Sequence, residues 1–482
     1  MLIRQTLLYV PAQLVGPLFQ FIAAIAWTHW FDAAGYGVLA LILAAQELIY
    51  FSCLGWWSHA TLRYLGEAKS AKERRRYLAA ESGVIVVTSL LQAVAALGAF
   101  AIFDLPMSPG LATATVAFTI SRSLLTYLGD RARTEGRVGA YTATQFAGPA
   151  LGFLVAFACV ALVSPTPAAA IAGFAAAQAL GALAVAWTLG VGAAFGRIDP
   201  RILSRAFVYG APLIVAGAVG WASLNGIRLV VERFGSMEAV GLVSVGWGLG
   251  QRLASVAAMF FTAAAYPLAL RALQAGRRAE ALEHLSLNGA LLFGLLAPMA
   301  AGLVFVARPL AELLIAAPFQ AATIAILPAA ALGGALRNWR VHFFDQPMLL
   351  FERTRLLMAL SIGEAAMTLA FCLVGLVKGG IVGAVWGCVA ATAITAAISA
   401  CFATLMFGLR LPLGHIARFS AATGAMSLAL SFGGWGAASP GRALAGAVAI
   451  GVAVYGASLA ALYPDATRAL LARLRKRPAR AA

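Results

Sequence analysis

Four charged residues lie inside long apolar runs of the sequence: Glu47, Arg122, Arg252 and Glu364. A charge at the centre of a bilayer costs about 2.5–3.5 kcal/mol on the insertion scale, so each of these residues needs a ligand or a partner. A guanidinium can hold a phosphate through two parallel hydrogen bonds. We therefore expect Arg122 and Arg252 to bind an anion. We expect Glu47 and Glu364 to bind a proton or a coupling cation.

The alternative is that these arginines and glutamates pair with one another and hold helices together. Threonines at helical spacing surround Arg122, and small or polar residues surround Arg252, which favours a polar cavity face over lipid. Arg228 lies near the outer end of its apolar run. We expect it to extend its guanidinium to the membrane surface.

A further polar stretch follows an apolar run that is too short to cross a bilayer. Residues 321–336 would form about 24 Å of helix, against roughly 30 Å of hydrocarbon. The helix should therefore continue through 337–345, with Asn338, His342 and Asp345 on one face. Such a stretch must face protein or a water-filled cavity, or else sit in a locally thinned bilayer. Arg337 and Arg340 join the expected anion-binding residues.

The composition indicates that these residues are held by helices in lipid. The chain has 482 residues, of which 62% are apolar and 11% charged, and its mean hydropathy is +0.88. Soluble proteins are nearer 45–50% apolar and about 25% charged. The runs are continuously apolar, whereas strands of a transmembrane barrel alternate. The sequence predicts an all-α membrane protein.

Fourteen runs are long enough to be transmembrane helices. The predicted spans are 7–30, 38–62, 83–103, 110–129, 141–163, 168–195, 207–230, 239–268, 287–307, 320–343, 356–377, 381–409, 419–437 and 443–463. Every connection between them is short. No loop is long enough to form an extramembrane catalytic domain, so we do not expect an enzyme.

Lysine and arginine are concentrated in alternate connections. With the N-terminus inside, 28 of the 35 lie in inner segments, 4 in outer segments and 3 within spans. This asymmetry predicts that both termini are cytoplasmic. Because the basic residues are scattered over eight short segments, we expect no nucleic-acid partner. The basic tail, residues 464–482, is expected to contact anionic membrane lipids.

Weak self-similarity recurs at about 200 residues. Gly37 and Gly241 occupy similar turns, and Gln46-Glu47 aligns with Gln251-Arg252. A repeat of six spans predicts two parallel lobes around a central cavity. The lobes would be 1–206 and 207–418, followed by two additional helices at 419–463 and the tail. A chance match between two glycine-rich membrane sequences is the alternative.

The sequence lacks the common cofactor signatures. The five cysteines all fall inside apolar runs without metal-ligand spacing. No lysine stands in a phosphate-binding glycine-rich loop. We expect no cofactor, no metal site and no catalytic residue, and therefore no ATP hydrolysis by this chain.

Several segments together resemble a known family. They are the opening Leu7-Leu-Tyr9, the turn Ala34-Gly-Tyr-Gly37, Arg63-Tyr-Leu65 and the segment Phe343–Leu350. These resemble the polysaccharide-exporter branch of flippases, which includes the O-antigen and capsule flippases. This branch belongs to the same superfamily as the lipid II flippase and the multidrug and toxic compound extruders.

The resemblance implies two six-helix lobes around a cationic cavity in the bacterial inner membrane. It also implies export of an undecaprenyl-pyrophosphate-linked oligosaccharide for O-antigen, lipopolysaccharide or exopolysaccharide synthesis, beside a polymerase and glycosyltransferases. The main alternative is an ion-coupled drug antiporter of the same superfamily, whose cavity should favour carboxylates over arginines. A pathway enzyme would need a large extramembrane domain, and a scaffold would not need buried charge in both lobes.

Overall fold

The computed structural model describes residues 2–66, 70–192, 199–433 and 439–468, and in these ranges it contains helices and no strand. Side chains are described in the same ranges except at 2–14, 71 and 260–265. Each of the fourteen predicted spans overlaps a helix, which confirms the expected all-α membrane architecture. Ten helices among the described residues are long and apolar enough to cross a membrane.

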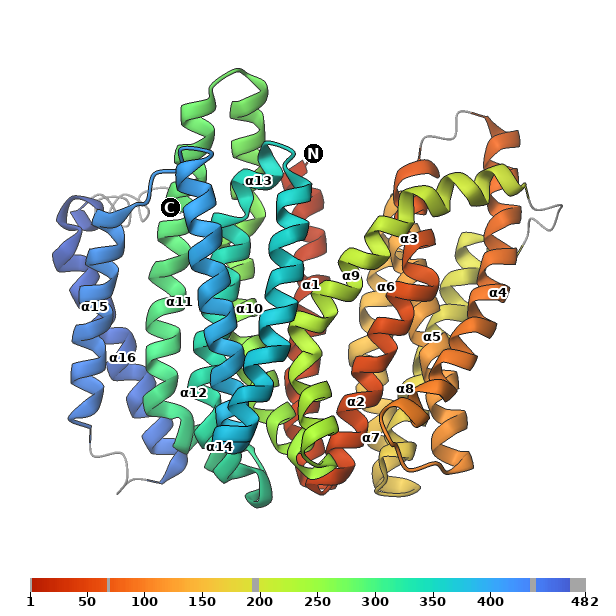
Figure 1. Cartoon of the computed structure of the whole chain (residues 1–482), viewed down its shortest axis with the longest axis horizontal. Helices are drawn as coiled ribbons and strands as arrows, with labels where there is room; N and C mark the ends of the chain where they lie inside the picture. Colours follow the sequence, from red (N-terminus) through yellow and green to blue (C-terminus); the bar gives the residue numbers. More distant parts are fainter. Residues whose placement is uncertain (1, 67–69, 193–198, 434–438, 469–482) are drawn as a thin grey trace, which may run out of the picture. The chain divides into compact units, whose positions relative to one another are not determined.

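The helices divide between two compact units (Figure 1). The first unit contains residues 1–245 and 361–384, and the second contains residues 246–360 and 385–482. Helices of the first unit are α1 (Leu2–Trp30), α2 (Ala33–Tyr50), α3 (Trp56–Tyr64), α4 (Ala71–Ile102), α5 (Pro109–Thr134), α6 (Val138–Phe146), α7 (Gly152–Leu162), α8 (Pro167–Leu189) and α9 (Pro200–Phe234). The predicted lobe boundaries at 206 and 418 stay a prediction.

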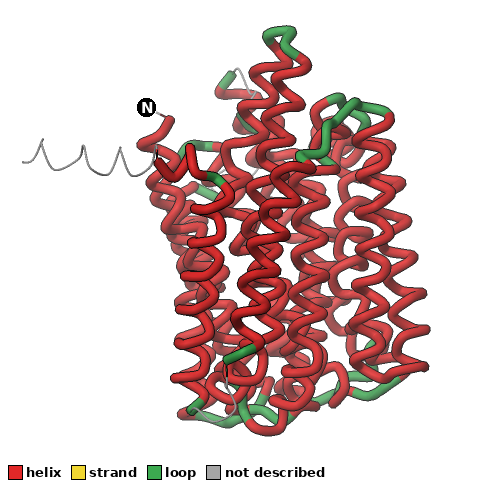
Figure 2. Tube along the Cα trace, turned by 90° about the vertical axis from the view of Figure 1, so that its left-hand side faces the viewer, coloured by secondary structure: helices red, strands yellow, loops and turns green. Residues whose placement is uncertain are grey.

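Two long helices contribute to both units. These are α10 (Met237–Gln274) and α14 (Thr354–Leu405). The second unit also contains α11 (Arg278–Leu314), α12 (Ala317–Trp339), α13 (Gln346–Leu350), α15 (Leu413–Ser431) and α16 (Pro440–Leu462). The tube in Figure 2 shows helices running side by side, with loops gathered at their ends.

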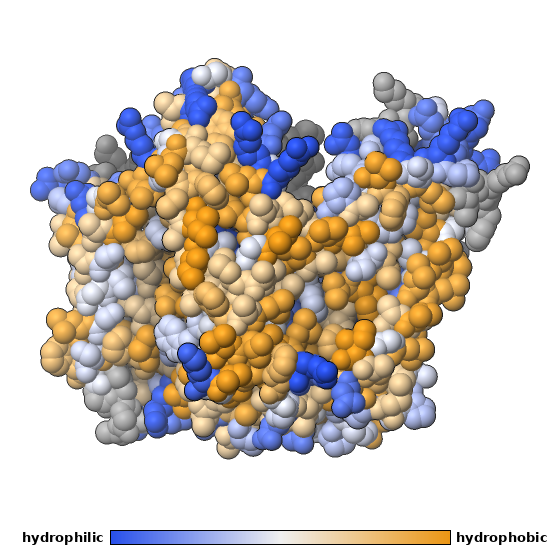
Figure 3. All heavy atoms as spheres, in the orientation of Figure 1, coloured by the Kyte–Doolittle hydropathy of each residue, from blue (hydrophilic) through white to orange (hydrophobic). Residues whose placement is uncertain are grey.

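The outer surface of the helices is apolar. On α4, Val86, Leu90 and Val94 are each 60–70% exposed. Figure 3 shows such apolar side chains over the sides of the helices and hydrophilic ones gathered near helix ends. An apolar exterior of this kind requires lipid as its solvent.

Three predicted spans contain a π-helical turn. The turns are η1 (Phe51–Gly55) between α2 and α3, η2 (Ala147–Leu151) between α6 and α7, and η3 (Arg340–Phe344) after α12. Pro149, which cannot donate a backbone hydrogen bond, lies in η2. Each π-turn inserts one residue into the helix and so rotates the faces that follow it.

The long helix α14 is two helices joined at a glycine pair. Gly379 and Gly380 leave the helical conformation, and Gly380 has φ of +58°. A Cβ on Gly375 would lie 2.1 Å from the carbonyl oxygen of Gly383, so the chain reverses within eight residues. This turn separates the spans that were predicted at 356–377 and 381–409.

Equivalent glutamines support the predicted repeat. Gln46 of α2 donates its Nε2 to Ser123 Oγ of α5 at 3.2 Å. Gln251 of α10 donates its Nε2 to the carbonyl oxygen of Ala330, on α12, at 3.3 Å. Helices α2 and α5 are the second and fourth spans of the first repeat, and α10 and α12 are those of the next. The neighbouring charges, Glu47 and Arg252, therefore occupy equivalent positions.

The glycines of the two repeated turns pack directly against each other. A Cβ on Gly37 would lie 2.2 Å from the carbonyl oxygen of Met237, and one on Gly241 would lie 1.8 Å from that of Ala33. The first turns of α2 and α10 thus approach so closely that neither position has room for a side chain. Both contacts lie within the first unit.

We expect Gly37→Ala to destabilise the protein. The added methyl group must push α2 away from Met237, at a cost of about 1–3 kcal/mol for overpacking. The matched control is Gly98→Ala in α4, where nothing lies within 4 Å of the added Cβ. Because alanine favours a helix, the control should be neutral or stabilising. Thermal unfolding in detergent measures both, and equal melting temperatures for Gly37→Ala and the wild type would contradict the contact.

Candidate functional site

In the first unit, a line of polar side chains connects α2, α5, α9 and the start of α10. Asn225 donates its Nδ2 to Glu47 Oε2 at 3.5 Å, and the guanidinium of Arg122 interacts electrostatically with the same carboxylate. Arg228 donates from one NH group to Asn225 Oδ1 and from Nε to Ser244 Oγ at 3.1 Å. We call these five residues the α2–α9 polar line.

The charged members of the line are accessible and the neutral members are buried. Glu47 is exposed, and Arg122 and Arg228 are half-buried. Asn225 and Ser244 are 5% and 4% exposed. The buried amide and hydroxyl therefore orient charges whose other sides remain accessible. Arg228, which was expected to extend to the membrane surface, instead joins this line, because Asn225 and Ser244 lie within its reach.

The other predicted carboxylate is enclosed. Glu364 of α14 is 2% exposed and belongs to the first unit. The same part of α14 packs on α9, where a Cβ on Gly226 would lie 2.9 Å from the side chain of Leu369. Arg122 and Glu47 are thus brought together as the sequence allowed, while Glu364 lies on a different helix in a buried position.

In the second unit, Arg252 is half-buried on α10. Its guanidinium folds back along its own helix over Gly248, whose added Cβ would lie 3.5 Å from NH1. Among the residues that the structure describes, no carboxylate forms an ion pair with Arg252.

The polar stretch after α12 continues as helix, as predicted, and packs against protein. Asn338 donates its Nδ2 to Ser255 Oγ of α10 at 3.4 Å, whereas Asp345 accepts from Ser399 of α14. The two side chains do not form the single polar face that was expected. The physical reason is the π-turn η3, which adds one residue to the helix between Asn338 and Asp345. The extra residue rotates the Asp345 side chain toward α14, whereas Asn338 faces α10.

The two arginines of this stretch differ in their surroundings. Arg340 is 4% exposed, and its Nε lies 3.3 Å from Asp345 Oδ2. Arg337 is half-buried near the end of α12. Of these two predicted binding residues, Arg340 is therefore ion-paired with a carboxylate, while part of the Arg337 side chain is accessible.

A buried ion pair in the first unit was missed at the sequence level. Glu81 of α4 and Arg131 of α5 are 1% and 0% exposed, and Arg131 NH1 donates to Glu81 Oε2 at 2.5 Å. Arg131 also donates to the carbonyl oxygen of Leu189 at 2.9 Å, and the hydroxyl of Tyr127 donates to Glu81. The sequence assigned both charges to connections, because charged residues mark the ends of apolar runs.

A signal for this pair was present in the spacing. Tyr127, Arg131 and Glu135 recur every four residues, as do Tyr77 and Glu81, so each set lies on one helix face. In the structure, the ring of Tyr77 stacks on Trp57 with centroids 4.8 Å apart. The spacing thus places tyrosines and charges together on one face of α4 and on one face of α5, a pattern typical of a polar network between two helices.

The described residues include no group of three or more His, Cys, Asp and Glu side chains that could hold a metal ion. The five cysteines are free thiols. The chemistry available in the apolar spans is therefore that of guanidinium, carboxylate, amide and hydroxyl groups. Such groups can bind anions, protons or small cations.

The fold is similar to that of solved transporters. The structure "Lipid II flippase MurJ, inward closed conformation" matches with a TM-score of 0.75 and 13% identity, over 96% of this chain and 100% of that chain. An inward-facing multidrug resistance MATE family transporter of the MOP superfamily matches with a TM-score of 0.68 and 14% identity, over 82% and 98%. No protein-family model matches the sequence, and no curated protein matches it.

These likenesses establish the fold of MOP-superfamily transporters for this chain. The two neighbours are a flippase and a drug transporter. The chain is therefore a multi-pass membrane protein with a transporter fold. At 13–14% identity, the likeness does not extend to the substrate.

We expect Arg131→Met to destabilise the protein strongly. The substitution leaves the buried carboxylate of Glu81 without its ion-pair partner, which costs about 3–5 kcal/mol. The matched control is Arg133→Met, which removes an exposed pair with Asp130 and should cost less than about 1 kcal/mol. Thermal unfolding in detergent and membrane abundance are the measurements. A smaller effect for Arg131→Met than for Arg133→Met would show that the buried pair is not structural.

Proposed function

We propose that this chain flips a lipid-linked oligosaccharide, carried on undecaprenyl pyrophosphate, across the bacterial inner membrane by alternating access. The single observation that carries the proposal is Arg252: an accessible guanidinium in the middle of a span, with no ion-paired carboxylate among the described residues. A pyrophosphate that crosses the bilayer centre loses much of its hydration. A guanidinium can replace that hydration with two parallel hydrogen bonds.

Arg122 and Arg337 extend the same chemistry to other helices. Each is half-buried within a transmembrane segment. Arg340 is the fourth proposed binding residue, and its pairing with Asp345 would have to loosen when substrate binds. The likeness over 96% of the chain to a structure titled a lipid II flippase supports a lipid-linked substrate. A polysaccharide polymerase and glycosyltransferases of the same pathway are the proposed partners.

The proposed orientation places both termini and the arginine-rich connections in the cytoplasm. Its support is the ratio of 28 to 4 basic residues between the two sides. Export of a glycan that is assembled on the inner leaflet requires the substrate to enter from that side. The ends of α3, α4 and α5 that carry arginines would then flank the entry.

The second candidate function is an ion-coupled antiporter of small molecules or drugs. Glu47 favours it, because an exposed carboxylate inside a span could bind an organic cation. The multidrug transporter likeness, at a TM-score of 0.68, also supports it. The arginines at Arg122 and Arg252 argue against a cationic substrate, since like charges at a binding site repel.

In either function, Glu47 and Glu364 are the proposed coupling groups. Glu47 accepts a hydrogen bond from Asn225 and interacts electrostatically with Arg122 in the α2–α9 polar line, so a change in its protonation would alter the charge balance of that line. Glu364 lies in a buried position on α14. Proton or cation binding could thus bias the helices of the first unit between two arrangements.

We expect Arg252→Ala to reach the membrane at near-normal abundance and to lose export. Arg252→Lys should be intermediate, because lysine keeps the charge and lacks the bidentate geometry. The matched control is Arg271→Ala, an exposed arginine on the same helix, which should export normally. Surface glycan and membrane abundance are measured in cells that lack the native chain. Full export by Arg252→Ala would refute the binding role, and loss of the protein would favour a structural role.

We expect Glu47→Gln or Glu364→Gln to flatten the pH dependence of transport. Glutamine mimics the protonated acid, so a step that requires deprotonation or cation binding no longer responds to pH. The matched control is Glu312→Gln, whose carboxylate forms an exposed pair with Arg308. Transport into vesicles across a pH series is the measurement. The coupling proposal fails when both variants keep the wild-type rate and pH profile.

A further inference from the structure

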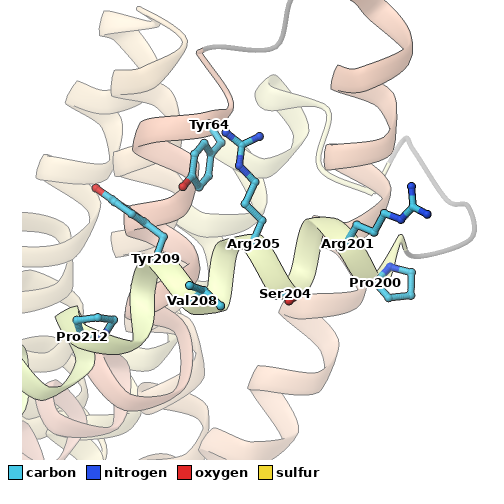
Figure 4. Close-up of a pocket in the computed structure, with 8 residues that line it drawn as sticks. All are labelled: Tyr64, Pro200, Arg201, Ser204, Arg205, Val208, Tyr209 and Pro212. Atoms are coloured by element: carbon cyan, nitrogen blue, oxygen red, sulfur yellow. The ribbon is translucent and has the colours of Figure 1, made fainter.

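A pocket lies between α3 and the first turns of α9, apart from the charged residues of the spans (Figure 4). Its volume is about 830 Å³, within the range of small-molecule sites. The lining is formed by Tyr64, Pro200, Arg201, Ser204, Arg205, Val208, Tyr209 and Pro212. All of these residues belong to the first unit.

The polar groups of the pocket come from one face of α9. Arg201, Ser204, Arg205 and Val208 follow the spacing of three and four residues that places side chains on one side of a helix, and all four are exposed. Gly210 of α9 packs closely on α3, where an added Cβ would lie 2.6 Å from Trp56. The helix is therefore anchored by its small residue and presents two arginines and a hydroxyl to the pocket.

Two tyrosines of the pocket lining contact arginine guanidiniums through their rings. The guanidinium of Arg205 lies 4.1 Å from the ring centroid of Tyr64, and that of Arg63 lies 5.3 Å from the ring centroid of Tyr209. The two rings contact each other edge to face, with centroids 5.5 Å apart. A guanidinium stacked on a ring uses its face for the contact and keeps its N–H groups at the edge for hydrogen bonds.

The surroundings of the pocket favour a lipid over a soluble anion. On the same helix, Phe207 and Val208 are 52% and 71% exposed, so apolar surface adjoins the arginines directly. Pro212 extends the apolar part of the lining. A ligand with a phosphate at one end and hydrocarbon at the other can contact both the arginines and the apolar side chains of the pocket. A free phosphate would contact only the arginines.

We propose that this pocket binds the phosphate headgroup of an anionic phospholipid of the cytoplasmic leaflet. The choice of leaflet rests on the orientation proposed above, but the binding itself does not depend on the transported substrate. The position of the pocket on α9 links it to the α2–α9 polar line. The same helix carries Asn225 and Arg228 of the α2–α9 polar line, so a lipid bound at its start contacts an element of the proposed transport machinery.

The test measures lipid retained by the full-length protein in detergent after incubation with phosphatidylglycerol or phosphatidylcholine. We expect the wild type to retain phosphatidylglycerol preferentially. Arg201→Gln combined with Arg205→Gln should weaken retention at least about tenfold, since each removes a charge-assisted hydrogen bond. The matched control is Arg418→Gln, which removes an exposed arginine stacked on Tyr463 outside the pocket and should leave retention unchanged.

Two substitutions of Tyr64 separate stacking from general destabilisation. Tyr64→Phe keeps the ring beneath Arg205 and should bind like the wild type, whereas Tyr64→Leu should weaken retention. Equal retention of both lipids, or no loss in the double arginine variant, overturns the proposal. Displacement of the lipid by inorganic phosphate at comparable concentration would instead assign the pocket to a soluble anion and also overturns it.

The leaflet is tested with Ser204→Cys in a chain whose five native cysteines are replaced. An impermeant thiol reagent should label this position in inverted vesicles and not in intact cells. Phosphatidylglycerol in the vesicles should slow the labelling relative to phosphatidylcholine. Labelling from outside intact cells would contradict the leaflet assignment. These assays require no transport, so a failure of lipid binding is distinguishable from a failure of the proposed flippase function.

Discussion

The constraint on which the structure depends is that hydrocarbon offers no hydrogen bonds to the chain. Every backbone group within the membrane must then be satisfied inside a helix, which explains the absence of strands in the described ranges. The exceptions are local. Three π-turns interrupt the regular pattern within spans. Interruptions of this kind are tolerated where protein, rather than lipid, surrounds the backbone. The Gly379-Gly380 reversal, by contrast, is exposed and lies between two spans.

Without a hydrophobic driving force between helices, close packing must supply the association energy. Gly37 and Gly241 bring α2 and α10 into backbone contact, and Gly375 and Gly383 do the same for the two halves of α14. The dispersion attraction in such contacts falls steeply when the helices move apart from their optimal separation. Close packing of this kind favours movement of whole helices as packed units over continuous bending.

Because hydrocarbon solvates charge poorly, the charged residues of the spans fall into two groups, those in enclosed ion pairs and those with an accessible side. Glu81 with Arg131, and Arg340 with Asp345, are enclosed ion pairs in which each charge offsets part of the desolvation cost of the other. Glu47, Arg122 and Arg252 keep an accessible side, so their cost is offset only by a partner or a ligand. This difference in burial is the physical basis for assigning a binding role to Arg252, and it leaves Arg340 as the less available of the predicted binding residues.

The sequence alone determined the fold class, the approximate positions of the helices and the position of the α14 reversal, because hydropathy and length act locally along each helix. The repeat was also visible, in Gln46 and Gln251, since equivalent helices keep equivalent contacts. Only the tertiary structure decided which charges are enclosed. Glu81 and Arg131 stand at the ends of apolar runs and look like loop residues, and they become buried because α4 and α5 extend past those runs and pack together. Likewise, a one-residue π-turn rotated Asp345 away from Asn338, and the pocket at Arg205 exists only where α9 crosses α3. Periodicity shows which face of a helix is polar, but the neighbour that meets that face depends on contacts between segments distant in the chain.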